Sequence, residues 1–184
     1  MDALGLVLIT VVPVLAAVVW FYNRLVRNRN LVNEAWAGID VQLQKRHELV
    51  PNLVATVKGY MSHESGLFEK VARIRSARDA GVAELGRRET ELSHSLGQLF
   101  ALAENYPELK ASDGFRQLHA SLVEIEEDLQ YARRYYNGAV RNNNNAVESF
   151  PSNLVAGLFR FRSAEFFEIE LASHRSVPDV SLAP

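Results

Sequence analysis

The sequence predicts an all-α protein, with an N-terminal transmembrane helix followed by a long, antiparallel, coiled-coil-like bundle of three to four helices. One supporting observation is an uncharged, apolar run of 20 residues near the start of the chain. Another is a series of apolar residues spaced alternately by three and four, which is typical of helices that pack side by side. Pro and Gly are few, with 6 and 10 among 184 residues, and this favours helix over sheet.

The apolar run, Ala3 to Tyr22, is long enough to cross a bilayer as a helix of about 30 Å. Trp20 and Tyr22 stand at its end, where aromatic side chains favour the boundary between membrane and water. A cleaved signal peptide is the alternative. It would have a shorter apolar core and small residues where Trp20-Phe21-Tyr22 stands, so we predict a retained anchor.

Flanking charge predicts how this anchor is oriented. Arg24, Arg27 and Arg29 follow the run, whereas no Lys or Arg precedes it. The positive-inside rule then places the N-terminus outside and the C-terminal domain in the cytoplasm of a single-pass protein. The predicted parts are a membrane anchor over 1–23, a helical bundle over 24–172 and a disordered tail over 173–184.

Beyond the anchor, three heptad-like series predict three long helices. They cover residues 32–74, 92–106 and 115–150, with breaks at 81–86, 107–114 and 151. At about 1.5 Å per residue, the helices measure roughly 70, 30 and 55 Å, so the second is too short to cover both long partners. Either the final segment or another molecule covers the rest, and because long uncovered apolar stripes are rare on monomers, we predict a homo-oligomer.

The oligomer or bundle seam includes both apolar and polar positions: Trp36, Leu43, Arg46, Glu64, Tyr136 and Asn143. Arg46 and Glu64 have two interpretations, as long side chains that reach water at bundle ends or as buried polar layers. For Asn143, which lies among small and aromatic residues, we favour a layer that sets helix register. Asn143→Val is then expected to raise stability and loosen the oligomer.

The segment after Pro151 is rich in aromatic residues and carries two arginines. One interpretation is a last bundle helix that packs its aromatic side chains into the core. The other is an interfacial helix whose arginines contact anionic lipid. The residues concerned are Phe159, Arg160, Phe161, Arg162, Phe166 and Phe167.

The sequence contains no pattern that predicts catalysis, a cofactor or a metal. There is no cysteine, and the net charge of -2 argues against nucleic acid as a partner. Glu91 and His94 form one Glu-x-x-His, but a di-iron bundle needs a second copy and two further glutamates. Phosphate-binding glycine loops and nucleophile elbows are also missing from the sequence, so we expect a protein that is not an enzyme.

Several strings resemble the LemA family of bacterial membrane proteins over a stretch from Tyr22 to about residue 168. They include Glu34-Ala35-Trp36, Leu49-Val50-Pro51-Asn52-Leu53-Val54 and Glu104-Asn105-Tyr106-Pro107. One departure is Asn143, near which the family pattern has an aromatic residue. The resemblance implies an anchored helical bundle in the bacterial inner membrane, with no catalytic residue to carry over. It also implies a link to membrane organisation, since some relatives are associated with shaping internal membranes.

These observations together predict a membrane-anchored, self-associating scaffold that organises or remodels the bacterial membrane. Its expected partners are the lipid bilayer and further copies of the chain. The alternative is a membrane-tethered adaptor whose bundle docks another membrane or cytoplasmic protein without catalytic activity.

Overall fold

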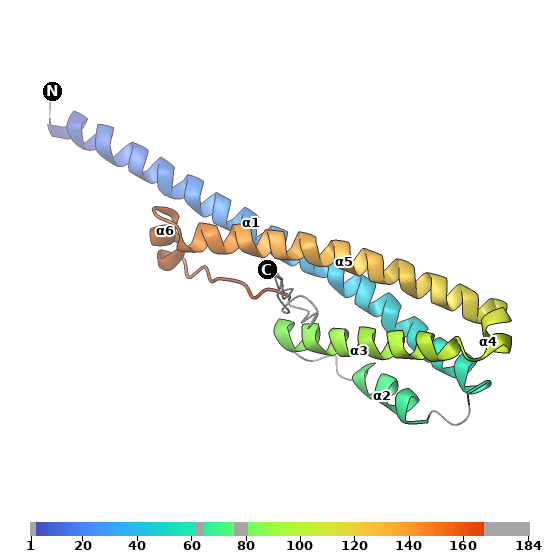
Figure 1. Ribbon diagram of the computed structural model, residues 1–184. Coiled ribbons are helices and arrows are strands. Elements are labelled where there is room, and N and C mark those ends of the chain that lie inside the picture. The colour runs from blue at the N-terminus through green and yellow to red at the C-terminus, as the bar shows by residue number, and fades with distance from the viewer. Residues whose placement is uncertain (1–2, 62–64, 76–80, 168–184) are drawn as a thin grey trace, which may run out of the picture. The chain divides into compact units, whose positions relative to one another are not determined.

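The computed structural model describes residues 3–61, 65–75 and 81–167, without the side chains at 3–8, 10, 65 and 72–75. Over these ranges the chain forms six helices and no strand, which confirms the all-α class (Figure 1). In chain order the helices are α1 (Ala3–Lys58), α2 (Ser65–Arg75), α3 (Val82–Ala103), α4 (Pro107–Ala111), α5 (Asp113–Glu148) and α6 (Ser152–Leu158).

The chain divides into two compact units, and the boundary falls inside α1 and α5. The first unit combines Met1–Lys45 with Ile125–Phe166. The second unit contains Arg46–Glu124 and also Phe167. Both long helices therefore contribute to each unit.

In the first unit, α1 and α5 pair in antiparallel directions. The Asn28 side-chain amide donates to the Asn142 carbonyl at 3.3 Å, and the rings of Trp36 and Tyr136 lie 5.4 Å apart, so residue numbers fall on one helix as they rise on the other. Where α5 ends, Leu25 packs with residues of α6 in a small apolar cluster. This unit thus consists of one helix pair capped by a short helix.

In the second unit, five helices surround one apolar core. α1 supplies Val50 and Leu53, α2 supplies Phe68, and α3 supplies Leu96 and Leu99, all of them buried. Helix α2 lies against α3 (Figure 1), and the Lys70 ammonium is 3.5 Å from the Glu91 carboxylate. Leu109 of α4 and Phe115 of α5 close the same core.

The predicted helix over 32–74 is interrupted. Its register continues through Pro51, but α1 ends at Lys58, and the Val57 carbonyl accepts hydrogen bonds from the amides of Tyr60 and Met61 at 3.0 Å. Gly59 stands at this turn, where its low helix propensity disfavours a further turn of helix. The rest of the apolar series forms α2, so the single long helix of the prediction was wrong.

The predicted breaks at 81–86 and 107–114 are only partly present. α3 begins at Val82, so Gly86 lies inside the helix. α4 occupies most of the second break and starts at Pro107, where a missing amide proton and a preset φ are compatible with a first helical residue. The third break is present, because α5 ends just before Pro151.

The helix expected after Pro151 forms only in its first part. α6 ends at Leu158, and Arg160 adopts a left-handed backbone with φ 58. The Phe161 amide donates to the Ala156 carbonyl at 2.9 Å, which is the long closing bond of a Schellman helix end. Phe159, Arg160, Phe161, Arg162, Phe166 and Phe167 therefore lie in a turn and an extended segment, and the prediction of a helix there was wrong.

Two further predictions fall on residues outside those described: Glu64 and the tail over 173–184. Among the residues that were described, none of the helices is both long and apolar enough to cross a membrane. The predicted span Ala3–Tyr22 includes 3–8 and 10, whose side chains also lie outside that description.

Candidate functional site

The residues predicted for the membrane boundary lie near one end of the helix pair in the first unit. Trp20 and Tyr22 are exposed, as are Arg24, Arg27 and Arg29. The Arg24 guanidinium lies 5.5 Å from the centre of the Trp20 ring, within the range of a cation–π attraction. This part of α1 therefore presents aromatic rings and cations together.

The segment after α6 packs on this part of α1. The Tyr22 ring meets those of Phe159 and Phe161 edge to face, at 4.8 and 5.7 Å between ring centres. The Arg29 guanidinium lies 5.3 Å from the Phe161 ring. Aromatic pairs of this geometry are each worth about 0.5–1.5 kcal/mol beyond the area they bury. They hold the end of α6 beside the end of the apolar run.

Around α6, four large apolar side chains point away from the core. They are Phe150, Leu154, Leu158 and Phe159, with 81%, 64%, 73% and 49% of their surfaces exposed, and we call them the α6 tip. The opposite side of the helix carries Val155 and Ala156, which are buried against Leu25. Four large apolar side chains exposed around one short helix make the α6 tip a candidate site of interaction.

Beyond the tip, residues 161–166 form an extended strap that Asn144 of α5 holds by its backbone. The Asn144 side-chain amide donates to the Ala164 carbonyl at 2.9 Å, and its side-chain oxygen accepts from the Ala164 amide at 2.8 Å. One side chain thus satisfies both polar groups of a residue that has no helix or sheet partner. This pairing fixes the position of the strap along α5.

Two neighbouring side chains of α5 extend the same contact. The Asn143 side-chain amide donates to the Arg162 carbonyl at 3.3 Å, and the Tyr136 hydroxyl donates to the Glu165 carbonyl at 2.9 Å. Burial of the phenol raises the pKa of Tyr136, and the charge of Glu165 raises it further. The neutral, donating form of Tyr136 is therefore favoured beside the strap.

The predicted seam residues of the first unit are buried or half-buried. Leu43 and Tyr136 are buried, and Trp36 is half-buried against the Tyr136 ring. Asn143 is buried, but its bond runs to the strap of its own chain. Because Asn143→Val also removes this part-buried hydrogen bond within the chain, the loss of the bond opposes the gain in stability that the sequence predicts for the substitution.

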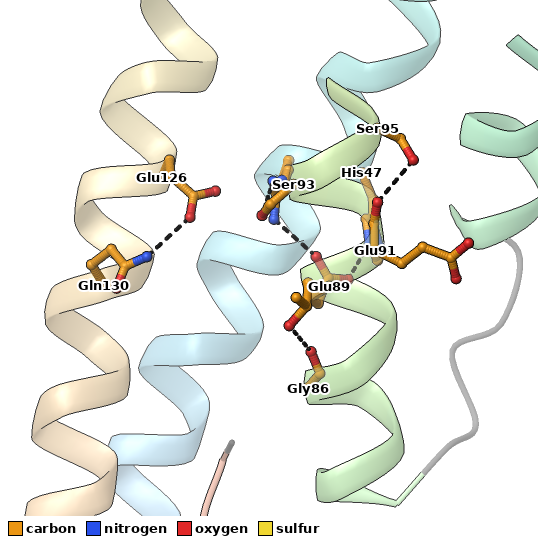
Figure 2. Close-up of polar contacts among 10 residues, drawn as sticks. His47, Gly86, Glu89, Glu91, Ser93, Ser95, Glu126 and Gln130 are labelled. Atoms are coloured by element: carbon orange, nitrogen blue, oxygen red, sulfur yellow. Dashed lines mark hydrogen bonds and ion pairs between the residues drawn. The ribbon is translucent and has the colours of Figure 1, made fainter. Parts of the chain in front are cut away.

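The second unit contains a buried polar cluster formed by Arg46 and His47 of α1 with Glu89 and Ser93 of α3. Arg46 Nη1 lies 3.2 Å from Glu89 Oε2, and Arg46 Nη2 donates to the Ser93 hydroxyl at 2.7 Å. His47 Nε2 lies 2.8 Å from the other Glu89 oxygen (Figure 2). Arg46 is 3% exposed and Glu89 1% exposed. Arg46 is thus a buried polar layer, and its interpretation as a side chain that reaches water was wrong.

This cluster joins α1 to α3. Each oxygen of the Glu89 carboxylate has its own partner on α1, and the Glu89 side chain is 2% exposed. A buried ion pair contributes little net stability but strongly specifies which groups lie opposite each other, since either member alone is unfavourable in the core. The arrangement supports a structural role in setting the register of the two helices.

Glu89 and His47 of this cluster were not predicted from the sequence. A signal for Glu89 was present, because Leu85, Glu89 and Leu92 continue the spacing of four and three of the second apolar series toward its N-terminal end. Starting that series at Leu92 left Glu89 outside the seam. His47 directly follows a seam position, and no local pattern predicts its partner 42 residues away.

The second unit also has a cavity of about 490 Å³ at the junction of α3, α4 and α5. The Phe100 and His119 rings meet there edge to face at 4.4 Å. Its wall mixes apolar with charged side chains: Phe100, Ala101, Ala103, Glu104, Lys110, Phe115, Arg116 and His119. In the described part of the chain, no group of three or more His, Asp or Glu residues is placed to hold a metal ion.

Comparison with known proteins gives a consistent result. The family model described as the LemA family matches residues 35–182. The chain is also similar to the magnetosome proteins MamQ 1 and MamQ 2 of Paramagnetospirillum magneticum, at 23% identity over 87% of this chain and 69% of each relative. It is 21% identical to the magnetosome protein MamQ of Magnetospirillum gryphiswaldense, over 89% of this chain and 71% of the relative. Protein LemA of Metamycoplasma hominis is 24% identical over 73% of this chain and 63% of its own length.

Proposed function

Because this chain belongs to the LemA family, we propose that it is a membrane-anchored, non-catalytic helical scaffold that self-associates and organises or remodels the bacterial membrane. The observation that carries the proposal is the uncharged run Ala3–Tyr22 at the start of α1. Relatives named as magnetosome proteins agree with what the family resemblance implies, a link to internal membranes.

The anchor is supported by the surroundings of the described side chains in this run. Ile9 and Val14 are more than half exposed, and so are Leu15 and Val19. Apolar surface left in water is unfavourable by roughly 25 cal/mol per Å², and a helix that is apolar all round belongs in a core or a bilayer. In Figure 1 this part of α1 continues beyond α6, its neighbour in the first unit. The exposed apolar surface of this run therefore supports a bilayer as its surroundings.

Charge supports one orientation of this anchor. Arg24, Arg27 and Arg29 follow the run, so the N-terminus lies outside and the chain beyond Arg29 faces the cytoplasm from the inner membrane. A protease added to right-side-out vesicles should leave α5 intact, while the same protease should cut it after the vesicles are opened. Cleavage of α5 in sealed vesicles would reverse the orientation.

Self-association is supported by the outer face of the helix pair in the first unit. Tyr131 and Tyr135, four residues apart on α5, are both more than half exposed. Tyrosine is enriched in the centres of protein interfaces, because its ring buries apolar area while its hydroxyl keeps a polar partner. This face gives a second copy of the chain a place to bind.

The test of the scaffold is the shape of vesicles that carry the full chain. Electron micrographs should show tubes or flattened vesicles, and crosslinking should give mostly links between copies. The matched control is Val12→Arg with Leu15→Arg, two exposed positions whose charges oppose insertion while leaving the rest of the chain unchanged. Vesicles that carry many copies of the full chain and yet stay as spherical as those incubated with the control protein would count against remodelling.

The alternative, an adaptor that docks another membrane or cytoplasmic protein, is favoured by the cavity beside Phe100. Its wall, which mixes apolar and charged side chains, is suited to a side chain or short segment of another protein. Crosslinking in cells separates the two functions, since an adaptor yields a dominant foreign partner. Phe100→Asp should abolish that link and leave links between copies intact.

A further inference from the structure

We propose that the α6 tip is a second membrane contact, which lies in the headgroup boundary of an anionic bilayer beside the N-terminal anchor. This inference rests on the proposed membrane anchoring and names further residues and the lipid chemistry they meet. It is carried by three features of the first unit: an exposed apolar surface, its fixed place beside Tyr22 and a surplus of arginine around it.

The apolar surface is organised to face outward. Leu154 and Leu158 lie four residues apart and therefore on one face of α6, whereas Val155 and Ala156 lie on the buried face. Phe150, in the turn before α6, is the most exposed of the four tip residues. The helix is thus tied to the protein by small buried residues and presents its large side chains to the surroundings.

The position of the tip is set by contacts on Tyr22. Tyr22 ends the uncharged run, and its ring touches Phe159 of the tip at 4.8 Å between centres. Phe161, just beyond the tip, also packs on α1. Its ring lies 5.7 Å from the Tyr22 ring and 5.3 Å from the Arg29 guanidinium. A helix end held to the last residue of a membrane span lies at the level of the headgroups, where aromatic side chains are most favourable.

The charge around the tip fits an anionic surface. Residues 20–30 and 141–166 of the first unit contain two glutamates, Glu148 and Glu165, against six arginines. Arginine binds phosphate through two parallel hydrogen bonds, and each cation near an anionic leaflet adds about 1 kcal/mol of attraction. The arginines are Arg24, Arg27, Arg29, Arg141, Arg160 and Arg162.

A second copy of the chain is the other occupant that such an apolar surface could have. Contact between two identical tips around a twofold axis would bring the same arginine-rich surroundings together from both sides. Like charges facing one another across an interface are unfavourable. The charge around the tip therefore favours lipid over a symmetric contact between copies.

The experiment uses the full chain, which has no cysteine, so a single introduced thiol carries the only spin label. Leu158→Cys reports on the tip and Val14→Cys on the anchor. Val41→Cys, 51% exposed on α1 in the same unit, is the matched control. Each labelled protein is placed in vesicles with and without anionic phosphatidylglycerol, and label accessibility is measured to oxygen and to a water-soluble nickel chelate.

We expect the ratio of oxygen to nickel accessibility at position 158 to rise severalfold in anionic vesicles relative to the control label at 41, and to rise less in zwitterionic vesicles. A label at 158 that matches the control, while the label at 14 reports bilayer, would overturn the tip contact and leave the anchor standing. Loss of accessibility to both reagents at 158, with spin–spin broadening that dilution by unlabelled chain removes, would assign the tip to a second copy. A label at 14 that stays in water would overturn anchor and tip together.

Discussion

In the second unit, segments of five helices close around one apolar core, whereas the first unit has a single pair of long helices whose seam is completed by a short helix and a strap. The polar contacts differ in the same way. Glu89 and its partners are side chains buried between two helices, whereas the Asn144 side chain bonds to the backbone of Ala164 in the extended strap. The first unit is also where large apolar side chains remain exposed, at the α6 tip and along the N-terminal run. The second unit therefore buries its large apolar side chains within the chain, whereas the first leaves several of them exposed.

The largest expected effect is at the buried cluster of the second unit. Glu89→Ala removes the carboxylate that Arg46 and His47 both contact, and breaking a buried pair on one side typically costs about 3–5 kcal/mol in the free energy of unfolding. Urea unfolding of the full chain in mild detergent, followed by circular dichroism, measures it.

The matched control is Glu91→Ala on the same helix. Glu91 is half exposed and pairs with Lys70 at 3.5 Å, so its loss is expected to stay within about 1 kcal/mol. Equal effects of the two substitutions would contradict a buried, register-setting role for Glu89.

A comparison of two leucines sharpens the difference between the units. Leu99→Ala empties a fully buried site in the second unit and should cost about 2–5 kcal/mol, whereas Leu158→Ala at the α6 tip should change the unfolding free energy by less than about 0.5 kcal/mol. Contact of the tip with lipid should show the reverse order, with only Leu158→Ala lowering the oxygen-to-nickel accessibility ratio of a label at Leu154→Cys in anionic vesicles. A destabilised Leu158→Ala protein in detergent would show that the tip packs within the chain.

The strap offers a test at intermediate scale. Asn144→Ala removes two hydrogen bonds to Ala164 and should cost about 1–3 kcal/mol, confined to the strap and its neighbours. Hydrogen exchange at the Ala164 amide should accelerate, while the amides of α3 keep their protection. Asn145→Ala, at the exposed neighbouring position, is the control and should leave exchange at Ala164 unchanged.

The smallest effect concerns pH. Because the pKa of Tyr136 is raised in the folded chain by burial and then by the charge of Glu165, the phenol contributes stability that is fully present below its unfolded pKa of about 10. That contribution should fall as pH rises through the raised folded value. Tyr136→Phe should lose about 1 kcal/mol at neutral pH and flatten the decline above pH 10, measured by urea unfolding. An unchanged alkaline decline would assign it to other groups.

Periodicity in the sequence predicted the all-α class and much of the buried seam. Leu43, Val50, Leu53, Leu96, Leu99 and Tyr136 are buried as the spacing of three and four requires, because that spacing places residues on one face of a helix. The turn after Lys58 was missed because the apolar series stays in step on both sides of it. Heptad spacing alone does not distinguish one long helix from two that happen to share a register.

The remaining misses depend on contacts between distant residues. The Asn142–Asn145 tract has no local meaning, but Asn143 and Asn144 are opposite the strap, about twenty residues later. Likewise, the aromatic-rich composition of the segment after Leu158 led to the prediction of a helix. They lie in extended chain because Arg160 ends α6 and α5 offers polar side chains to the backbone that follows. Such partners appear only when the fold brings the segments together.

The most direct test of the account is flotation of the full chain with lipid vesicles through a density gradient, after washing in high salt and then in alkaline carbonate. We predict that the chain rises with the vesicles after both washes and that the protein carrying Val12→Arg and Leu15→Arg stays at the bottom. A full chain that remains at the bottom, or floats no better than that variant, would contradict a membrane anchor. The exposed apolar end of the first unit would then need a protein partner.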